Sequence, residues 1–213
     1  MILASSRRAA GALLVTGLTV AFVAGCSITG GVAPSATPAP VAAPVAAADC
    51  PTSQPDPLPA GETRTVTIST DLGDIAIKLD ADLSPIAVGN FVALAECGFY
   101  DGTVFHRVVP KFVIQGGGRE DGPGYTIQDE PVTTAYHRGT VAMARTTEPN
   151  SVDSQFFIVS DDSAAGALSS YNTYQIIGEV TAGMEIVDAI TAAADAEIPT
   201  DQVTMTKVTV TNP

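Results

Sequence analysis

An arginine and a glutamine stand in two neighbouring runs whose apolar residues alternate as in β-strands. In Thr103–Val109 the period of two places Phe105 and Arg107 on one face, so a guanidinium lies beside apolar side chains. The amide oxygen of Gln115 can orient that guanidinium, and the glycines at 116–118 let another backbone approach closely. An arginine that simply extends to water from a strand edge is the alternative. Together these features indicate a groove that accepts a peptide and offers it a permanently charged hydrogen-bond donor.

Several other kinds of chemistry lack their residues in this sequence. It has two His and three Cys and neither a CxxC nor an HExxH spacing, so we expect no metal and no cofactor. It has no GxGxxG, GxxxxGK[ST] or GxSxG motif, which excludes the common nucleotide-binding loops and the nucleophile elbow. The net charge of -13 repels polyanions, so we expect no nucleic-acid partner.

The elements that position these residues are mostly short strands. The alternation around the turn at 70–73 predicts a hairpin. Ser84 and Pro85, an N-cap and a first-turn proline, predict a helix over Pro85–Cys97, and a second helix is expected at Met184–Thr191. Further strands are predicted at Thr103–Val109, Phe112–Gln115, Thr140–Ala144, Phe156–Val159, Gln175–Val180 and Val203–Val210. Many short strands without regular βαβ alternation favour an antiparallel barrel or sandwich, with the two helices covering its open ends.

The first 25 residues are typical of an export signal. Arg7 and Arg8 precede an uncharged, mostly apolar run over 9–25. A transmembrane helix is the alternative, but about 20 apolar residues are normally needed to span a bilayer. The tetrapeptide VAGC ending at Cys26 resembles a bacterial lipobox, which implies that Cys26 is lipidated and becomes the mature N-terminus. The sequence thus predicts a lipid-anchored protein on the extracytoplasmic face of the cell membrane.

A linker is predicted between this signal and the folded domain. Residues 26–61 hold eight of the 15 prolines and only two charged residues, Asp49 and Asp56. Such a segment has few large apolar side chains to offset the entropy of ordering, and its prolines favour an extended spacer. Residues 62–213 then form one domain.

The segment FHRVVPKFVIQGG at 105–117 resembles the signature of the cyclophilin peptidyl-prolyl isomerases. Further similar segments follow the same order along 63–210: TDLGDIAIKL at 70–79, NF at 90–91, FYDGT at 99–103, VAMAR at 141–145 and SQFFI at 154–158. The resemblance implies a mainly β fold, a closed eight-stranded antiparallel barrel capped by two α-helices. It also implies a monomer that acts on proline-containing segments of exported proteins.

The resemblance also assigns roles to individual residues. Arg107 is the expected catalytic residue, with Gln115 beside it. The expected substrate-binding residues are Phe112, Val113, Ala144, Arg145, Gln155, Phe157, Leu168 and Tyr174. Ala144 and Arg145 are expected to contact the peptide through their backbone. An ideal pleat would place Phe112 opposite Val113 and Gln115, so the pattern does not explain how all three face one groove.

Cis/trans rotation about an X-Pro bond suits these residue types. It needs no nucleophile or metal, because the barrier of about 20 kcal/mol comes from amide resonance. A charged donor aimed at the prolyl nitrogen stabilises the twisted state more than either planar state. A catalytically silent module that holds Pro-rich or unfolded chains in the same groove is the rival interpretation. A two-lobed solute-binding lipoprotein is disfavoured, because the domain is short for two lobes.

Two further expectations concern cysteine and tryptophan. Cys50 and Cys97 are both expected in a compartment that permits disulfides, and we expect them to pair, with two free thiols as the alternative. Cyclophilins that bind cyclosporin tightly usually carry a Trp at the rim of the pocket. This chain has no Trp, and by resemblance the rim position falls near Ala167, so we expect weak cyclosporin binding.

Overall fold

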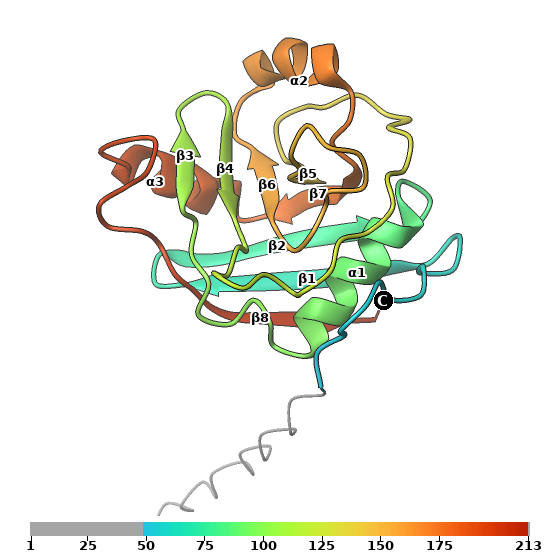
Figure 1. Ribbon diagram of the computed structural model, residues 1–213. Helices are drawn as coiled ribbons and strands as arrows, with labels where there is room; N and C mark the ends of the chain where they lie inside the picture. Colours follow the sequence, from blue (N-terminus) through green and yellow to red (C-terminus); the bar gives the residue numbers. More distant parts are fainter. Residues whose placement is uncertain (1–48, 213) are drawn as a thin grey trace, which may run out of the picture. The chain divides into compact units, whose positions relative to one another are not determined.

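The computed structural model describes residues 49–212 (Figure 1). Eight strands form one sheet: β1 (Thr63–Thr70), β2 (Gly73–Asp80), β3 (Arg107–Val109), β4 (Val113–Gly116), β5 (Thr140–Met143), β6 (Phe156–Val159), β7 (Ile176–Ala182) and β8 (Met205–Thr211). The helices are α1 (Pro85–Glu96), α2 (Ala165–Tyr171) and α3 (Met184–Ala193), and a short 3-10 helix, η1 (Asp162–Ala164), precedes α2. None of the helices within residues 49–212 has the length and apolar character needed to cross a bilayer.

The sheet is strongly curled and every pairing between its strands is antiparallel. Its strand order is β3-β4-β6-β5-β7-β2-β1-β8, which leaves β3 and β8 at the two edges. α1 packs against β2, β7 and β8, and α3 packs against β2, β3 and β4 (Figure 1). The mainly β, antiparallel, eight-stranded fold was predicted correctly.

The expectation of a closed barrel capped by two helices is wrong in two respects. Within residues 49–212 no ladder joins β3 to β8, so the sheet is an open, curled half-barrel. The outer edge of β3 is instead occupied by the irregular segment before β8, because Val108 N–H donates to the Glu197 carbonyl at 2.8 Å. Beside it, a single isolated bridge joins Val104 to Thr204. The third helix, α2, has seven residues and only one buried side chain, Leu168, so it carries little apolar periodicity to detect.

Helix α1 begins where the sequence predicts, but a different residue caps it. Pro85 is at the first position, yet the buried Ser84 side chain makes no cap hydrogen bond. The Glu130 carboxylate accepts hydrogen bonds from the backbone N–H groups of Ile86 and Ala87, each at 2.9 Å. A negative group at this end is also favoured by the helix dipole. The capping residue lies far from the helix in the sequence, so no local sequence pattern could predict this cap.

Residues 49–61 lie against α1, although the sequence assigned them to the linker. Leu58 N–H donates to the Pro85 carbonyl at 3.0 Å, and Gln128 N–H donates to the Gln54 side chain at 2.9 Å. The segment crosses α1 at Gly89, where an added Cβ would lie 2.4 Å from the Asp56 carbonyl oxygen. The absence of a side chain at Gly89 is therefore required for this close approach.

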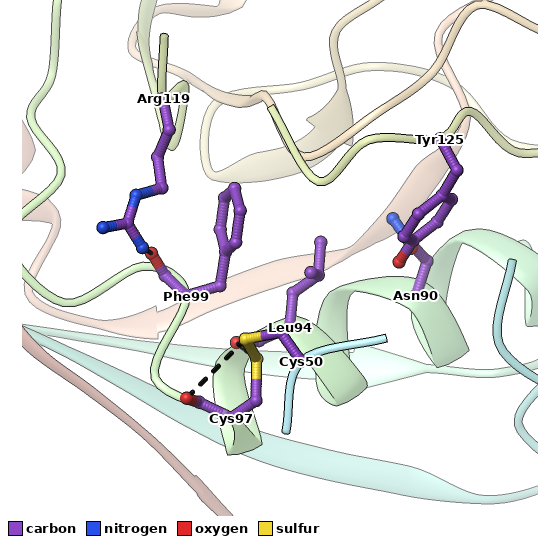
Figure 2. The surroundings of a disulfide bond; sticks show 7 residues. All are labelled: Cys50, Asn90, Leu94, Cys97, Phe99, Arg119 and Tyr125. Atoms are coloured by element: carbon purple, nitrogen blue, oxygen red, sulfur yellow. Dashed lines mark hydrogen bonds between the residues drawn. A yellow bond between two sulfur atoms is a disulfide. The ribbon is translucent and has the colours of Figure 1, made fainter. Parts of the chain in front are cut away.

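A disulfide between Cys50 and Cys97 joins the start of this segment to the end of α1 (Figure 2). Next to it, Arg119 donates to the Phe99 carbonyl at 3.1 Å, and its guanidinium lies 5.2 Å from the centre of the Phe99 ring. The bridge and the Arg119 contacts together connect the N-terminal segment, α1 and the loop that follows β4.

We expect replacement of both cysteines by serine, Cys50→Ser with Cys97→Ser, to lower the free energy of unfolding. A disulfide that closes a loop of this length stabilises by about 2–4 kcal/mol, chiefly by restricting the unfolded chain; the two cysteines are 47 positions apart. Urea unfolding with and without reductant measures the effect. Reductant should destabilise the unmutated protein and leave the double variant unchanged. Two reactive thiols per unfolded, unreduced chain in a Cys26→Ser background would contradict the bridge.

Candidate functional site

A row of side chains crosses one face of the sheet. Arg107 on β3 is paired with Gln115 on β4, Gln115 with Phe157 on β6, and Phe157 with Ala142 on β5. Directly opposite residues of neighbouring antiparallel strands share a face. Arg107, Gln115 and Phe157 therefore form one continuous line, with the guanidinium at the edge strand and the aromatic ring inside.

The two faces of these strands are both buried, in two separate clusters. Val108, Ile114, Val141 and Ile158 belong to the main hydrophobic core. Their neighbours on the opposite face belong to a second, smaller cluster: Val113, Ala142, Phe157 and Val159. Phe105 was expected to share a face with Arg107, but it precedes β3 and is fully buried in the main core. The period of two fails there because residues 105 and 106 are outside the strand.

The turn between β3 and β4 explains how Phe112 joins the same site. Lys111 has a positive φ of 60°, and Phe112 N–H closes the turn onto the Val109 carbonyl at 3.0 Å. Strand β4 begins only at Val113, so Phe112 does not follow the pleat of the strand. Val113 and Gln115 face the groove from the strand, while Phe112 reaches it from the turn.

Nine of the predicted site residues line one hollow of about 100 Å³: Arg107, Phe112, Val113, Gln115, Ala144, Arg145, Phe157, Leu168 and Tyr174. A second hollow of about 210 Å³ shares Gln115, Ala144 and Arg145 with the first and adds Gln155. The two hollows thus adjoin and form one groove. All ten residues predicted to form the catalytic and substrate-binding site lie along it, and their roles stay predictions.

The far wall of the groove is aromatic. The Phe157 and Tyr174 rings meet edge to face with centroids 5.3 Å apart, and Tyr171 continues the line at 6.3 Å from Tyr174. The Tyr136 hydroxyl donates to the Tyr174 carbonyl at 2.8 Å, which fixes the segment after α2. Leu168 of α2 is buried against this wall, whereas Ala167 is exposed. The apolar end of the groove therefore suits a small ring.

The polar side chains of the groove make different contacts from those expected. Gln115 was expected to orient Arg107 through its amide oxygen, but its side-chain hydrogen bond runs from its nitrogen to the Gln155 amide oxygen at 3.1 Å. The Arg107 hydrogen bond given by the structure runs from Nε to the Glu197 carboxylate at 2.7 Å. The sequence did not predict a role for Glu197, because this residue lies 90 positions from Arg107 in an irregular segment and no motif surrounds it.

The Arg145 guanidinium is held by contacts within the chain. The side chain is only 10% exposed and pairs with Asp129 at 3.0 Å. Its guanidinium also donates to the carbonyls of Thr146 and Glu148. These contacts immobilise the loop after β5, and they leave the backbone of residues 144 and 145 beside the groove, as expected for a backbone contact with a peptide.

His106 stands next to Arg107, and its imidazole is partly buried. Burial lowers the pKa of its imidazole below the ordinary 6.5, and the neighbouring Arg107 charge lowers it further. The folded protein binds this proton less tightly than the unfolded chain, so His106 subtracts stability as the pH falls below about 6.5. Residues 49–212 contain no group of three metal-ligating side chains. The groove combines a small hollow, lined by both polar and apolar side chains, with the Arg107 side chain.

Comparisons with known proteins point to one family. A family model described as "Cyclophilin type peptidyl-prolyl cis-trans isomerase/CLD" matches residues 65–210. A peptidyl-prolyl cis-trans isomerase of Acinetobacter baylyi is 41% identical over 142 residues, which cover 63% of this chain and 73% of the relative. Peptidyl-prolyl cis-trans isomerase B of Escherichia coli is 38% identical over 162 residues, or 68% of this chain and 98% of the relative.

A solved structure agrees with these sequence matches. The crystal structure of a cyclophilin type peptidyl-prolyl cis-trans isomerase from Cryptosporidium parvum superposes with a TM-score of 0.60. Its sequence is 29% identical to this chain, and the match covers 71% of this chain and 99% of that one. The match therefore spans nearly the whole of that enzyme.

We expect cyclosporin to bind weakly, because Ala167, which the resemblance places near the rim of the pocket, offers neither an indole N–H nor a ring. The missing hydrogen bond, at about 1 kcal/mol, and ring contact, at about 1–2 kcal/mol, together predict an affinity roughly 30- to 150-fold below that of a Trp-bearing relative. Calorimetric titration measures it. Ala167→Trp should recover most of the affinity, and Ser170→Trp on the same helix serves as the control. Nanomolar binding by the unmutated protein would contradict this assignment of the rim.

Proposed function

The chain belongs to the cyclophilin-type peptidyl-prolyl cis-trans isomerases, and we propose that it accelerates X-Pro rotation in exported proteins or peptides through Arg107. One observation carries this proposal: Arg107 lines the same small hollow as Phe112, Phe157 and Leu168. In the proposal a prolyl ring occupies this hollow, so that the guanidinium would lie beside the prolyl nitrogen.

The proposed chemistry is differential stabilisation of the twisted amide. Rotation removes amide resonance, so the prolyl nitrogen becomes pyramidal and basic. The Arg107 guanidinium would donate a hydrogen bond to that nitrogen more strongly in the twisted state than in either planar one. With Nε bound to Glu197, the terminal Nη groups are the donors directed to the substrate.

Arg107 would supply only part of the lowering of the activation barrier that catalysis requires. One preorganised donor is worth about 3–4 kcal/mol, whereas an acceleration of 10⁵ needs about 7 kcal/mol. The remainder is assigned to holding the ring in the apolar hollow while the carbonyl side of the bond rotates. Gln155 and the backbone at 144 and 145 would fix that flanking peptide along the adjoining hollow.

The rival proposal, a silent module that holds Pro-rich or unfolded chains, uses the same groove. Binding of a Pro-rich or unfolded chain through apolar contacts requires the aromatic wall of the groove but no positively charged side chain. The presence of Arg107 in the hollow, with Gln115 opposite it on β4, favours turnover over holding. Assay of the Arg107 variant distinguishes the two.

We expect Arg107→Ala to lower kcat/KM on an Ala-Pro peptide by at least about 100-fold, because it removes a donor worth roughly 3 kcal/mol in the transition state. Folding should survive, since the Arg107 side chain is 34% exposed and lies at an edge strand. A protease-coupled or NMR exchange assay of the full-length protein measures the rate, and circular dichroism checks folding.

Arg64→Ala is a suitable control for this test. Arg64 is also half-buried and also pairs with a glutamate, Glu62, but it lies on β1 away from the groove. Its replacement should leave kcat/KM unchanged within a factor of two, an estimate for a surface position with no catalytic contact. Full turnover by a folded Arg107→Ala protein would reject the proposed mechanism.

We also propose that the protein acts as a lipoprotein on the extracytoplasmic side of the membrane. The uncharged run over 9–25 and the lipobox-like VAGC at 23–26 support this proposal. Cys26 lies outside the residues that the structure describes. Two acyl chains hold a protein stably at a bilayer, because each buried CH₂ contributes about 0.8 kcal/mol. The predicted linker would then let the domain reach exported chains.

We expect Cys26→Ser to abolish incorporation of labelled palmitate. The acyl chains are attached to this cysteine in the proposal, and serine offers no thiol to carry them. The double variant Cys50→Ser with Cys97→Ser serves as the control, because it removes the disulfide-bonded pair without touching the lipobox. Label retained by the Cys26→Ser protein would contradict lipidation at this residue.

A further inference from the structure

One residue of the irregular segment before β8, Glu197, contacts the outer edge of strand β3. The carbonyl of Glu197 accepts a hydrogen bond from Val108 N–H at 2.8 Å. Its carboxylate accepts one from Nε of Arg107 at 2.7 Å. Glu197 therefore contacts two consecutive residues of β3, one through its backbone and one through its side chain.

Contacts on both sides of Glu197 fix this segment. Thr200 N–H donates to the Asp195 carboxylate at 3.0 Å, which closes a turn around residue 197. Farther along, Phe105 N–H donates to the Val203 carbonyl at 2.9 Å, so the segment stays beside β3. The Glu197 carboxylate is thus carried by a backbone that is itself attached to the strand bearing Arg107.

We propose that Glu197 is a positioning residue for the isomerase reaction: it holds the Arg107 guanidinium at Nε so that the two terminal nitrogens face the prolyl nitrogen. This inference rests on the proposed role of Arg107. A carboxylate bonded to Nε fixes the plane of the guanidinium, because the bond restricts the last torsions of a long side chain. The Nη groups remain for the substrate.

Gln115 alone does not supply this positioning. Its side-chain nitrogen donates to Gln155, and the side-chain hydrogen bond that Arg107 makes within residues 49–212 goes to Glu197. Glu197 approaches from the outer edge of β3, where no further strand lies. Glu197 therefore holds the guanidinium from the outer edge of β3, while Gln115 lies opposite Arg107 on β4.

The Arg107–Glu197 ion pair is solvent-exposed, so a positioning role for Glu197 can be distinguished from a role in folding stability. The side chains of Arg107 and Glu197 are 34% and 60% exposed. Ion pairs this exposed add little to folding stability, because water screens them. Loss of the carboxylate is therefore expected to change the rate constant and to leave the unfolding midpoint nearly unchanged.

The test is a double-mutant cycle on the full-length protein, with kcat and KM measured separately on an Ala-Pro peptide. Glu197→Ala should lower kcat by about 5- to 10-fold with KM nearly constant, because the donor is misplaced rather than removed. Glu197→Gln should keep kcat within about 3-fold of the unmutated value, since its amide oxygen still accepts from Nε. In an Arg107→Ala background, Glu197→Ala should have no further effect.

Asp201→Asn is the matched control, because it removes one negative charge from the same segment at an exposed residue. It should leave kcat unchanged. Equal losses in Glu197→Ala and Asp201→Asn would overturn the inference in favour of a general charge effect. A faster Glu197→Ala protein would also overturn it, because the carboxylate would then weaken the donor.

The cycle also separates this inference from the proposed function. If Arg107→Ala lowers the rate but both Glu197 variants retain full kcat, positioning by Glu197 is rejected and the role of Arg107 stands. If Arg107→Ala itself retains full kcat, the proposed mechanism fails first. A Glu197→Ala effect that persists without Arg107, or a matching fall in the thermal midpoint, would assign Glu197 a structural role instead.

Discussion

The pairing of β4 with β3 on one side and β6 on the other determines what the groove contains. These strands are buried on both faces, with Ile114 in the main core and Val113 in the second cluster. A slip of one residue would exchange the two faces. It would place the Gln115 amide and the Arg107 guanidinium in the main core without partners, which costs far more than any groove contact returns. The register that packs the core is therefore the register that aligns Arg107, Gln115 and Phe157.

The rest of the site depends on segments that are not strands. Phe112 reaches the groove from a turn made possible by the left-handed Lys111. Leu168 comes from a helix of seven residues, and Glu197 comes from the chain between α3 and β8. The rigid sheet fixes the row of side chains, and the irregular segments close the groove around it. This division is common in enzymes, where loops carry function on a scaffold that a core holds in place.

Local periodicity predicted the elements whose residues alternate over several turns or pleats. The strand at Phe156–Val159 and the starts of α1 and α3 agree with the sequence within a residue. The family resemblance, rather than periodicity, brought together Arg107, Phe112 and Leu168. Periodicity failed at Phe105, which lies beside a strand rather than in it, and at α2, which buries one side chain. Contacts between residues far apart in the sequence, such as Glu130 at the start of α1, leave no local pattern.

The acidity of the chain is explained in part by the same long-range and local contacts. Carboxylates accept hydrogen bonds from backbone N–H groups throughout the loops: Asp82 from Gly61, Asp101 from Val208, Glu130 from Ile86 and Ala87, Asp129 from Asn150, Asp153 from Gln155, Asp161 from Ser163, Asp162 from Arg138 and Asp195 from Thr200. Hydrogen bonds from Ser163 lower the pKa of Asp161, and those from Thr200 lower the pKa of Asp195. The two turns therefore keep the stability that these carboxylate contacts contribute above pH 3.8. They lose it as the pH falls from 3.8 through the lowered pKa values of Asp161 and Asp195.

These hydrogen bonds to carboxylates also affect which groups are available to Arg107 in the groove. Acidic side chains outnumber basic ones by 23 to 10, so a free guanidinium would readily be neutralised by a nearby carboxylate at its terminal nitrogens. Carboxylates that already accept hydrogen bonds from backbone N–H groups elsewhere are held away from Arg107. Within residues 49–212 the carboxylate that pairs with Arg107 is that of Glu197, and it binds at Nε. An acid-rich chain thereby keeps the terminal nitrogens of Arg107 as donors for a substrate, which is the condition that the proposed stabilisation of the twisted amide requires.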